Sequence, residues 1–259
     1  MQTENRYMIY NGELQPLQLP EEAFLYQNIH TLGYKPRHLK HHLDIITSSA
    51  GTLWGLEISL SENKIQKEIV QLLDHSRLSR NVSICVIIRL YATGDYSLHV
   101  GHVSIYSGYV LRSLRPVMQC IKMDVGMSNY PTSALKASYD LAYNMAVAQG
   151  SHEPIMINSA GYAIEDPLRP LAIIKDHTIT IPPPTLCSVE CMLLEEAAEK
   201  HGLTVNYGKI SLGDIKSADE VLMMTFQGIT SISQIENKIY FMSLAAKIAT
   251  RLEEIDLKE

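Results

Sequence analysis

One lysine stands inside an otherwise apolar helical pattern, in the stretch SALKASYD. The spacing of Leu135, Tyr139 and Tyr143 predicts an apolar stripe on a half-buried helix, with small alanines around it. Lys136 lies within this pattern, and its amine could form a Schiff base with the carbonyl group of a substrate or cofactor. The alternative is an ordinary surface lysine, whose methylene stem covers apolar neighbours while its charge stays in water.

Chemistry at such an amine needs partners, and three further positions offer them. A cofactor such as pyridoxal phosphate requires a carboxylate against its ring nitrogen and hydrogen-bond donors around its phosphate. Glu165 ends the segment INSAGYAIE, although glutamates at strand ends are usually solvated. A helix that begins near Ser188 has free first amides, and Thr225 adds a hydroxyl in the loop MMTFQGITS.

The histidines and cysteines give weaker signals. His38 and His42 are four residues apart, which suits two metal ligands on one helix face, but no third ligand accompanies them. We expect a solvated helix start there. Cys187 and Cys191 lack a second pair to complete a zinc site, so we expect unreactive thiols and no metal. The sequence contains no P-loop, no dinucleotide fingerprint and no nucleophile elbow.

The first half of the chain alternates between strand and helix signals. Asn11-Gly12 predicts a hairpin turn, and apolar periodicity predicts helices over 36–53 and 61–77. β-branched and alternating runs between these elements predict strands. This half therefore reads as a sheet with a pair of helices on it.

The helix over 61–77 has the clearest amphipathic pattern. Ile65, Ile69 and Leu72 form its predicted buried stripe. Lys64 and Glu68 are four residues apart, and we expect them to form an exposed ion pair.

A polar, turn-forming stretch, GMSNYPTS at 126–133, interrupts the periodicity and is the predicted linker. It separates a predicted N-terminal domain, 1–125, from a C-terminal domain, 134–259. The elements that we expect after it are helix 133–149, a strand PIMIN, a hairpin turning at Asp176-His177, helix 188–201, two short strands within 217–235, and helix 241–257.

Composition restricts the partners and the location. The chain has 259 residues, enough for one large domain or two modest ones, and a net charge of −6 without any basic block. Nucleic acid is therefore not an expected partner. No apolar run approaches the roughly 18 residues of a membrane span, and the N-terminus lacks the pattern of a signal peptide. We expect no membrane association and a cytoplasmic location.

Taken in order, these segments resemble the fold-type IV pyridoxal-phosphate enzymes. That group includes the branched-chain and D-amino-acid aminotransferases and aminodeoxychorismate lyase. The resemblance runs over nearly the whole chain and is more dilute in the N-terminal half. The segments that carry it are YNGEL, HLDIITSSAGTLWG, SALKASYDLAYNMAVAQG, IMINSAGYAIE and SADEVLMMTFQGITSISQI.

The resemblance implies a fold, a cofactor and a site. The fold would be α+β, like that of D-amino-acid aminotransferase, with a barrel-like C-terminal domain and a homodimeric assembly. Lys136 would hold pyridoxal 5′-phosphate as a Schiff base and move a proton between substrate and cofactor. Glu165 would pair with the pyridinium nitrogen. Thr225 and the amides near Ser188 and Val189 would hold the phosphate.

The phosphate side departs from the family pattern. The arginine that usually follows the helix histidine by three residues is Ile45, if that histidine is His42. The other register starts at His38 and places His41 there, as a weaker anion ligand. The usual Gly-Ile-Thr-Arg is Ser188-Val189-Glu190-Cys191. A carboxylate within about 5 Å of the phosphate would cost on the order of 1 kcal/mol or more.

Two more departures concern the reaction. Pro170 stands where an asparagine usually follows the glutamate, and Tyr26 stands where the lyase has a threonine, which counts against lyase activity. We therefore predict an aminotransferase that moves an amino group between a small amino acid and a 2-oxo acid. The alternatives are a lyase of the aminodeoxychorismate type, and a homologue that keeps the fold with weak or no cofactor binding.

Overall fold

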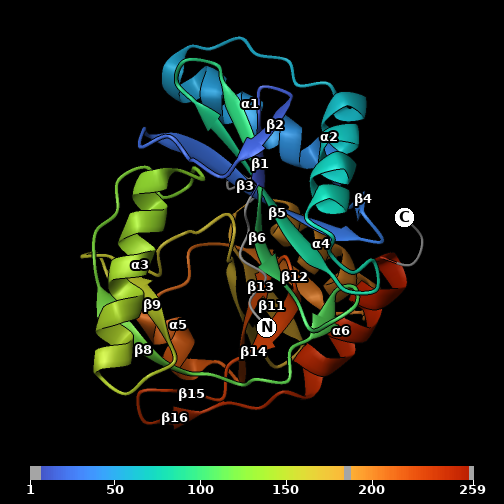
Figure 1. Ribbon diagram of the computed structural model, residues 1–259. Coiled ribbons are helices and arrows are strands. Elements are labelled where there is room, and N and C mark those ends of the chain that lie inside the picture. Colours follow the sequence, from blue (N-terminus) through green and yellow to red (C-terminus); the bar gives the residue numbers. More distant parts are fainter. Residues whose placement is uncertain (1–6, 184–187, 257–259) are drawn as a thin grey trace. The chain divides into compact units, whose positions relative to one another are not determined.

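The computed structural model describes residues 7–183 and 188–256 (Figure 1). The chain divides into two compact units. The first consists of Met1–Gly108 with Pro131–Ser133, and the second consists of Tyr109–Tyr130 with Ala134–Glu259. The two predicted domains, 1–125 and 134–259, and the linker between them stay a prediction.

The first unit is built on one antiparallel sheet in the order β2-β1-β6-β5-β3-β4 (Figure 1). Its strands are β1 (Tyr7–Tyr10), β2 (Glu13–Pro16), β3 (Phe24–Leu32), β4 (Lys35–Pro36), β5 (Ile84–Tyr91) and β6 (Tyr96–Val103). The predicted hairpin is confirmed, because Tyr10 pairs with Glu13 across the turn. Asn11 and Gly12 both have positive φ, 50° and 95°, as a tight hairpin turn requires.

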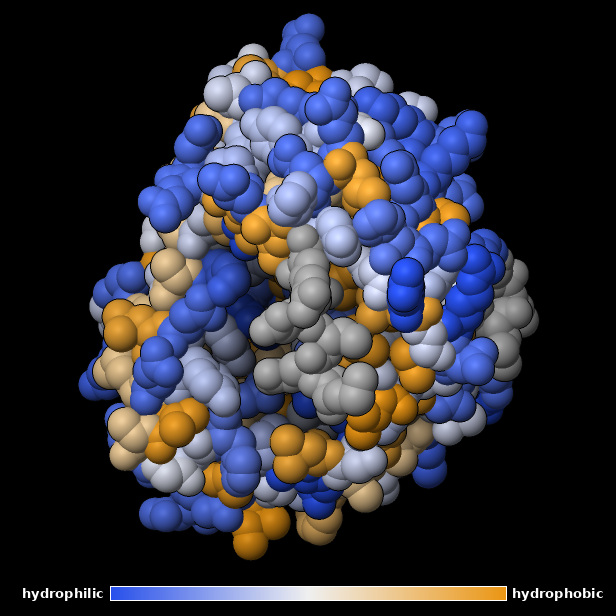
Figure 2. All heavy atoms as spheres, viewed as in Figure 1, coloured by the Kyte–Doolittle hydropathy of each residue, from blue (hydrophilic) through white to orange (hydrophobic). Residues whose placement is uncertain are grey.

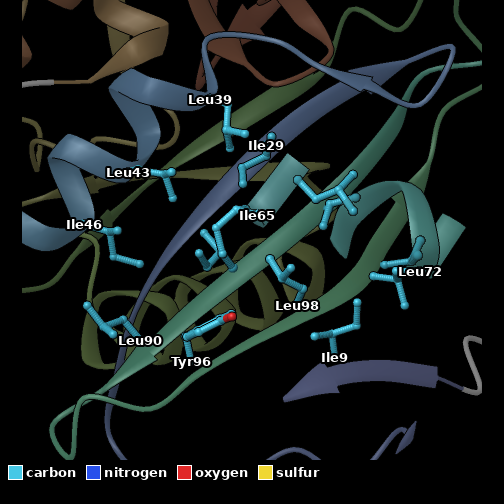
Figure 3. Packing of buried hydrophobic residues seen from close by; sticks show 14 of the residues in the cluster. Ile9, Ile29, Leu39, Leu43, Ile46, Ile65, Leu72, Leu90, Tyr96 and Leu98 are labelled. Atoms are coloured by element: carbon cyan, nitrogen blue, oxygen red, sulfur yellow. The ribbon is translucent and has the colours of Figure 1, made fainter. Parts of the chain in front are cut away.

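Two helices cover one face of this sheet, as their periodicity predicts. They are α1 (Leu39–Trp54) and α2 (Glu62–His75). Figure 3 shows Leu43 and Ile46 of α1, and Ile65 of α2, packing with strand residues in a single apolar core. The predicted stripe of α2 is buried. Figure 2 shows mainly hydrophilic side chains on the surface over α2, so this helix has one face for the core and one for water.

The predicted exposed pair of Lys64 and Glu68 is wrong for the glutamate. Glu68 is buried, and the Tyr96 hydroxyl donates to its two carboxylate oxygens at 2.9 and 3.0 Å. Lys64 Nζ lies 3.7 Å from the same carboxylate. The reason is helical geometry, since residue 68 lies between Ile65 and Leu72 on the face that meets the sheet.

The second unit contains two mixed sheets (Figure 1). Their orders are β12-β11-β10-β13-β14-β7 and β16-β15-β8-β9. The strands are β7 (Val110–Leu111), β8 (Val117–Lys122), β9 (Glu153–Ile157), β10 (Leu171–Lys175), β11 (Thr178–Ile181), β12 (Thr204–Tyr207), β13 (Glu220–Thr225), β14 (Gly228–Ser231), β15 (Gln234–Ile235) and β16 (Lys238–Ile239). The hairpin predicted at Asp176-His177 is confirmed as β10–β11, with Asp176 at φ 53°.

The helices of the second unit include one that periodicity did not predict. They are α3 (Ser133–Ala148), α4 (Val189–Lys200), α5 (Leu212–Ser217) and α6 (Ser243–Asp256). The predictions for α3, α4 and α6 are confirmed. α5 is only six residues long, and a capping box defines it: Ser211 and Asp214 bond each other's backbone N–H. Within the described ranges, no helix is both long and apolar enough to cross a membrane.

The predicted stripe on α3 is wrong at one position. Leu135, Ala142 and Ala146 are the buried residues of this helix, Tyr139 is half-buried, and Tyr143 is 42% exposed. Small alanines face the core where we expected a tyrosine, because α3 packs closely on β8 and β9 through Ile121 and Met156.

Candidate active site

Three segments of the second unit meet at one end of its larger sheet. β10 is antiparallel to both of its neighbours, β11 and β13, with Leu171 opposite Met223. The beginning of β10 therefore lies beside the ends of β11 and β13. Glu165 precedes β10, Thr225 ends β13, and α4 is the helix that follows β11.

Backbone hydrogen bonds just before Glu165 hold it in place. The Ala163 N–H donates to the Ile210 carbonyl at 2.8 Å, and the Ile164 N–H donates to the Met156 carbonyl at 2.9 Å. The Glu165 side chain is half-buried, and its Oε1 is buried with no hydrogen-bond partner in the described part of the chain. Such an oxygen costs on the order of 1–3 kcal/mol. The geometry thus suits a ligand that donates a hydrogen bond there.

An ion pair and a stacked ring connect the Glu165 loop to α3. Nε and Nη2 of Arg169 donate to Asp166 Oδ2 at 3.0 and 2.9 Å. The Arg169 guanidinium lies over the Tyr139 ring, 3.2 Å from its centroid. These three side chains line one pocket. We did not predict this group, although the D-x-x-R spacing directly after Glu165 was the available signal.

Lys136 lies on the same helix as Tyr139. Its amine donates to Asp140 Oδ2 at 2.5 Å, one turn further along α3. The Lys136 side chain is 41% exposed and that of Asp140 is 56% exposed. The structure therefore ties the helix of Lys136 to the Glu165 loop, while the amine itself is engaged by a carboxylate at the surface.

The start of α4 places a carboxyl group where the helix has free amides. The Ser188 hydroxyl accepts a hydrogen bond from the Cys191 N–H at 3.2 Å and donates to Glu190 Oε2 at 3.2 Å. Val189 and Glu190 are each 2% exposed. Burial, with a smaller contribution from the nearby Asp166 carboxylate, raises the pKa of Glu190 to about 8. Burial also raises the pKa of the Cys191 thiol to about 12.

The other predicted residues have simpler surroundings. Thr225 is half-buried, and its hydroxyl accepts from the Gln227 N–H at 3.3 Å. Cys187 lies outside the described residues. The described structure thus brings Glu165, Ser188, Val189 and Thr225 to one end of a sheet.

The histidine segment belongs to the first unit, so the role of His41 at the cofactor stays a prediction. His41 is exposed on α1, whereas Ile45 is buried. His42 is also buried, where we expected a solvated helix start, and its Nδ1 lies 2.8 Å from Gln27 Oε1. Desolvation lowers the pKa of His42 to about 3, so it is a neutral core histidine.

The sequence matches a known family along most of its length. The model for amino-transferase class IV matches residues 25–235. The chain belongs to the class IV aminotransferase family. The predicted family is confirmed. Among curated proteins, none matches the sequence.

Solved structures of aminotransferases and of a putative lyase share the fold. A branched-chain aminotransferase from Thermoproteus uzoniensis, crystallised with norvaline, has a TM-score of 0.79 at 15% identity, over 98% of this chain and 95% of that one. An aminotransferase from Brucella abortus, bound to the cofactor PLP, has a TM-score of 0.78 at 14% identity, over 97% and 99%. A putative 4-amino-4-deoxychorismate lyase from Legionella pneumophila has a TM-score of 0.73 at 16% identity, over 90% and 91%.

At these identities the likeness shows the fold alone. The predicted α+β fold of the fold-type IV enzymes is confirmed. The structural neighbours of this chain include a branched-chain aminotransferase and a putative lyase, so the fold does not identify the substrate.

Proposed function

We propose that this protein is a pyridoxal-phosphate-dependent aminotransferase that moves an amino group between a small amino acid and a 2-oxo acid. The observation that carries the proposal is the buried Oε1 of Glu165, which has no hydrogen-bond partner among residues 7–183 and 188–256. A protonated pyridine nitrogen is a donor that satisfies it. When bound, the protonated ring withdraws electrons from the reacting carbon of the substrate.

The chain's own groups divide the remaining work. Lys136 would hold the cofactor through its amine and then carry a proton at Nζ. The amine must first leave Asp140, because a protonated, ion-paired amine is not a nucleophile. Arg169 and Asp166 would fix the loop that carries Glu165, since Arg169 contacts both Asp166 and α3.

The sequence favours transfer over lyase chemistry. Tyr26, which is buried on β3, stands where the lyase-type threonine is expected. Products therefore provide a direct comparison: an aminotransferase yields a 2-oxo acid only when an amino acceptor is present, whereas a lyase needs none.

Cofactor binding at Lys136 is the first test. Purified protein incubated with pyridoxal phosphate should develop the visible absorbance of a Schiff base. Borohydride reduction followed by peptide mapping should then place the label on Lys136. The variant Lys136→Ala should show neither the absorbance nor the label.

A matched control is available on α4. Lys200 pairs with Glu196 at the same spacing and distance, 2.5 Å, as Lys136 with Asp140. Lys200→Ala should keep the absorbance. Wild-type protein that gives no lysine-dependent absorbance with excess cofactor would contradict the proposed enzyme and favour the non-catalytic homologue.

A further inference from the structure

The carboxyl group of Glu190 lies at the start of α4, beside the backbone donors of its first turn. It accepts a hydrogen bond from the Ser188 hydroxyl at 3.2 Å, and its own backbone N–H favours its charged form, while the Cys191 N–H donates to Ser188. The first amides of a helix have no partners within the helix, and an anion satisfies them best. An internal carboxyl group therefore lies where an external anion would bind.

The surroundings of Glu190 make this arrangement unfavourable for a second anion. Glu190 is buried. Asp166 faces it from the Glu165 loop and is ion-paired with Arg169. The Cys191 thiol is adjacent on α4, and Glu165 interacts with that thiol. A phosphate dianion at this helix start would meet the ionised Glu190 carboxylate.

We propose that Glu190, once ionised, is an internal competitor for the phosphate of the cofactor, so that in the alkaline range the phosphate adds little to affinity and the site also accepts unphosphorylated pyridoxal. This inference rests on the proposed function, because it takes the start of α4 as the phosphate end of the site. It makes Glu190 a specificity-determining residue for the form of the cofactor.

Two ligands that differ only in the phosphate isolate this effect. We would measure the Kd of pyridoxal phosphate and of pyridoxal from the lysine-dependent absorbance, in wild-type protein and in Glu190→Gln. Glutamine keeps the size and one acceptor oxygen, replaces the other oxygen with an amide NH2 and removes the charge. At pH 9, where Glu190 is ionised, the variant should bind pyridoxal phosphate about tenfold more tightly than wild type, and pyridoxal within about twofold. At pH 7, where its raised pKa keeps most of Glu190 protonated, the two proteins should bind pyridoxal phosphate within about twofold of each other.

An exposed carboxylate on the same helix gives the control. Glu199→Gln removes the same charge from α4 at an exposed position. It should leave both dissociation constants within about twofold of wild type. This comparison separates a local effect at the start of the helix from a general change in net charge.

The wild-type protein alone provides a second measurement that does not depend on the variant folding. A phosphate monoester is doubly charged above about pH 7, so its charge is constant in the alkaline range. The preference for pyridoxal phosphate over pyridoxal should fall at least about threefold between pH 7 and 9, as Glu190 ionises. Any effect of pH on Schiff-base formation cancels in this ratio, because both ligands bind the same amine.

The outcomes are distinguishable. Equal effects of Glu190→Gln on both ligands at pH 9, or a preference for the phosphorylated form that is constant with pH, would overturn the competitor and leave the proposed function intact. If neither ligand gives lysine-dependent absorbance in wild type or in Glu190→Gln, the proposed function fails and this inference fails with it.

Discussion

The fold fixes the position of the Glu165 side chain without any bound ligand. Its loop is fixed by two backbone hydrogen bonds, and one of its oxygens is buried without a partner in the described part of the chain. Neither property follows from the residue type. A glutamate at the end of a strand is usually solvated, so the sequence alone made Glu165 only a candidate. The fold buries one of its acceptor oxygens, which a ligand with a hydrogen-bond donor would satisfy.

The variant Glu165→Gln tests that role. Glutamine can still contact the ring nitrogen, but it cannot keep the nitrogen protonated. We expect the cofactor Kd to change by less than about tenfold and kcat to fall by about 10²-fold, the low end for a positioned acid–base partner. Stopped-flow kinetics of the first half-reaction provides the measurement. Turnover equal to wild type would show that Glu165 is not the partner of the ring nitrogen.

Arg169 also acts at the scale of a single residue. Its planar guanidinium bonds Asp166 through two nitrogens and stacks on Tyr139. Lysine has neither the fork nor the plane. Arg169→Lys should lower the free energy of unfolding by about 1–2 kcal/mol, measured by urea denaturation. Arg80→Lys is a useful control, because Arg80 also pairs with an aspartate and stacks on a tyrosine, but on the surface. A larger loss for Arg80→Lys would contradict the prediction.

At the scale of elements, the turn after Thr225 depends on one glycine. Gly228 has φ 109°, and it pairs with Val110 where β14 meets β7 in parallel. A Cβ at this position would lie 2.5 Å from the Val110 nitrogen. The turn that carries the predicted phosphate-binding hydroxyl therefore has room only for glycine.

Gly228→Ala should destabilise the protein by at least about 2 kcal/mol, because it adds a backbone clash to an unfavourable φ. Thermal or urea unfolding measures this. Gly126→Ala is the matched control, since a Cβ there meets nothing within 4 Å and the backbone is not in the left-handed region. A similar loss of stability in both variants would contradict the explanation.

The elements also show where local sequence is informative and where it is not. Helices α1 and α2 and the hairpins at Asn11-Gly12 and Asp176-His177 were predictable, because periodicity and turn chemistry are local. The burial of Glu68 was not, since it depends on Tyr96 in a distant strand. The contact of Arg169 with Tyr139 likewise joins residues thirty positions apart.

At the scale of the whole molecule, the order of the segments carried more information than any one of them. No single fragment of the sequence identifies the class IV family, yet the ordered set predicted both the family and the fold. The set of candidates Lys136, Glu165 and Thr225 came from that order. The position of Glu190 at the start of α4 could not be predicted from that order, because its burial depends on how the whole chain packs.

Buried titratable groups in the two units should give the protein a stability maximum near pH 6.5. His42 and His99 belong to the first unit, and desolvation lowers the pKa of each to about 3. Unfolding lets them take up protons, so stability is lost as the pH falls from about 6.5 towards 3. Burial raises the pKa of Glu190, in the second unit, to about 8. Unfolding releases its proton, so stability is also lost as the pH rises from about 4.5 to 8.

The two limbs of this profile can be separated by mutation. Between about pH 4.5 and 6.5 the two histidines outweigh Glu190, and between about 6.5 and 8 Glu190 has the largest raised carboxyl pKa, which places the maximum. Glu190→Gln should remove the loss between pH 6.5 and 8 and keep the acid limb, whereas Glu199→Gln should change neither. Differential scanning calorimetry across this range measures both limbs. Persistence of the alkaline loss in Glu190→Gln would show that the buried carboxyl group of α4 is not its source.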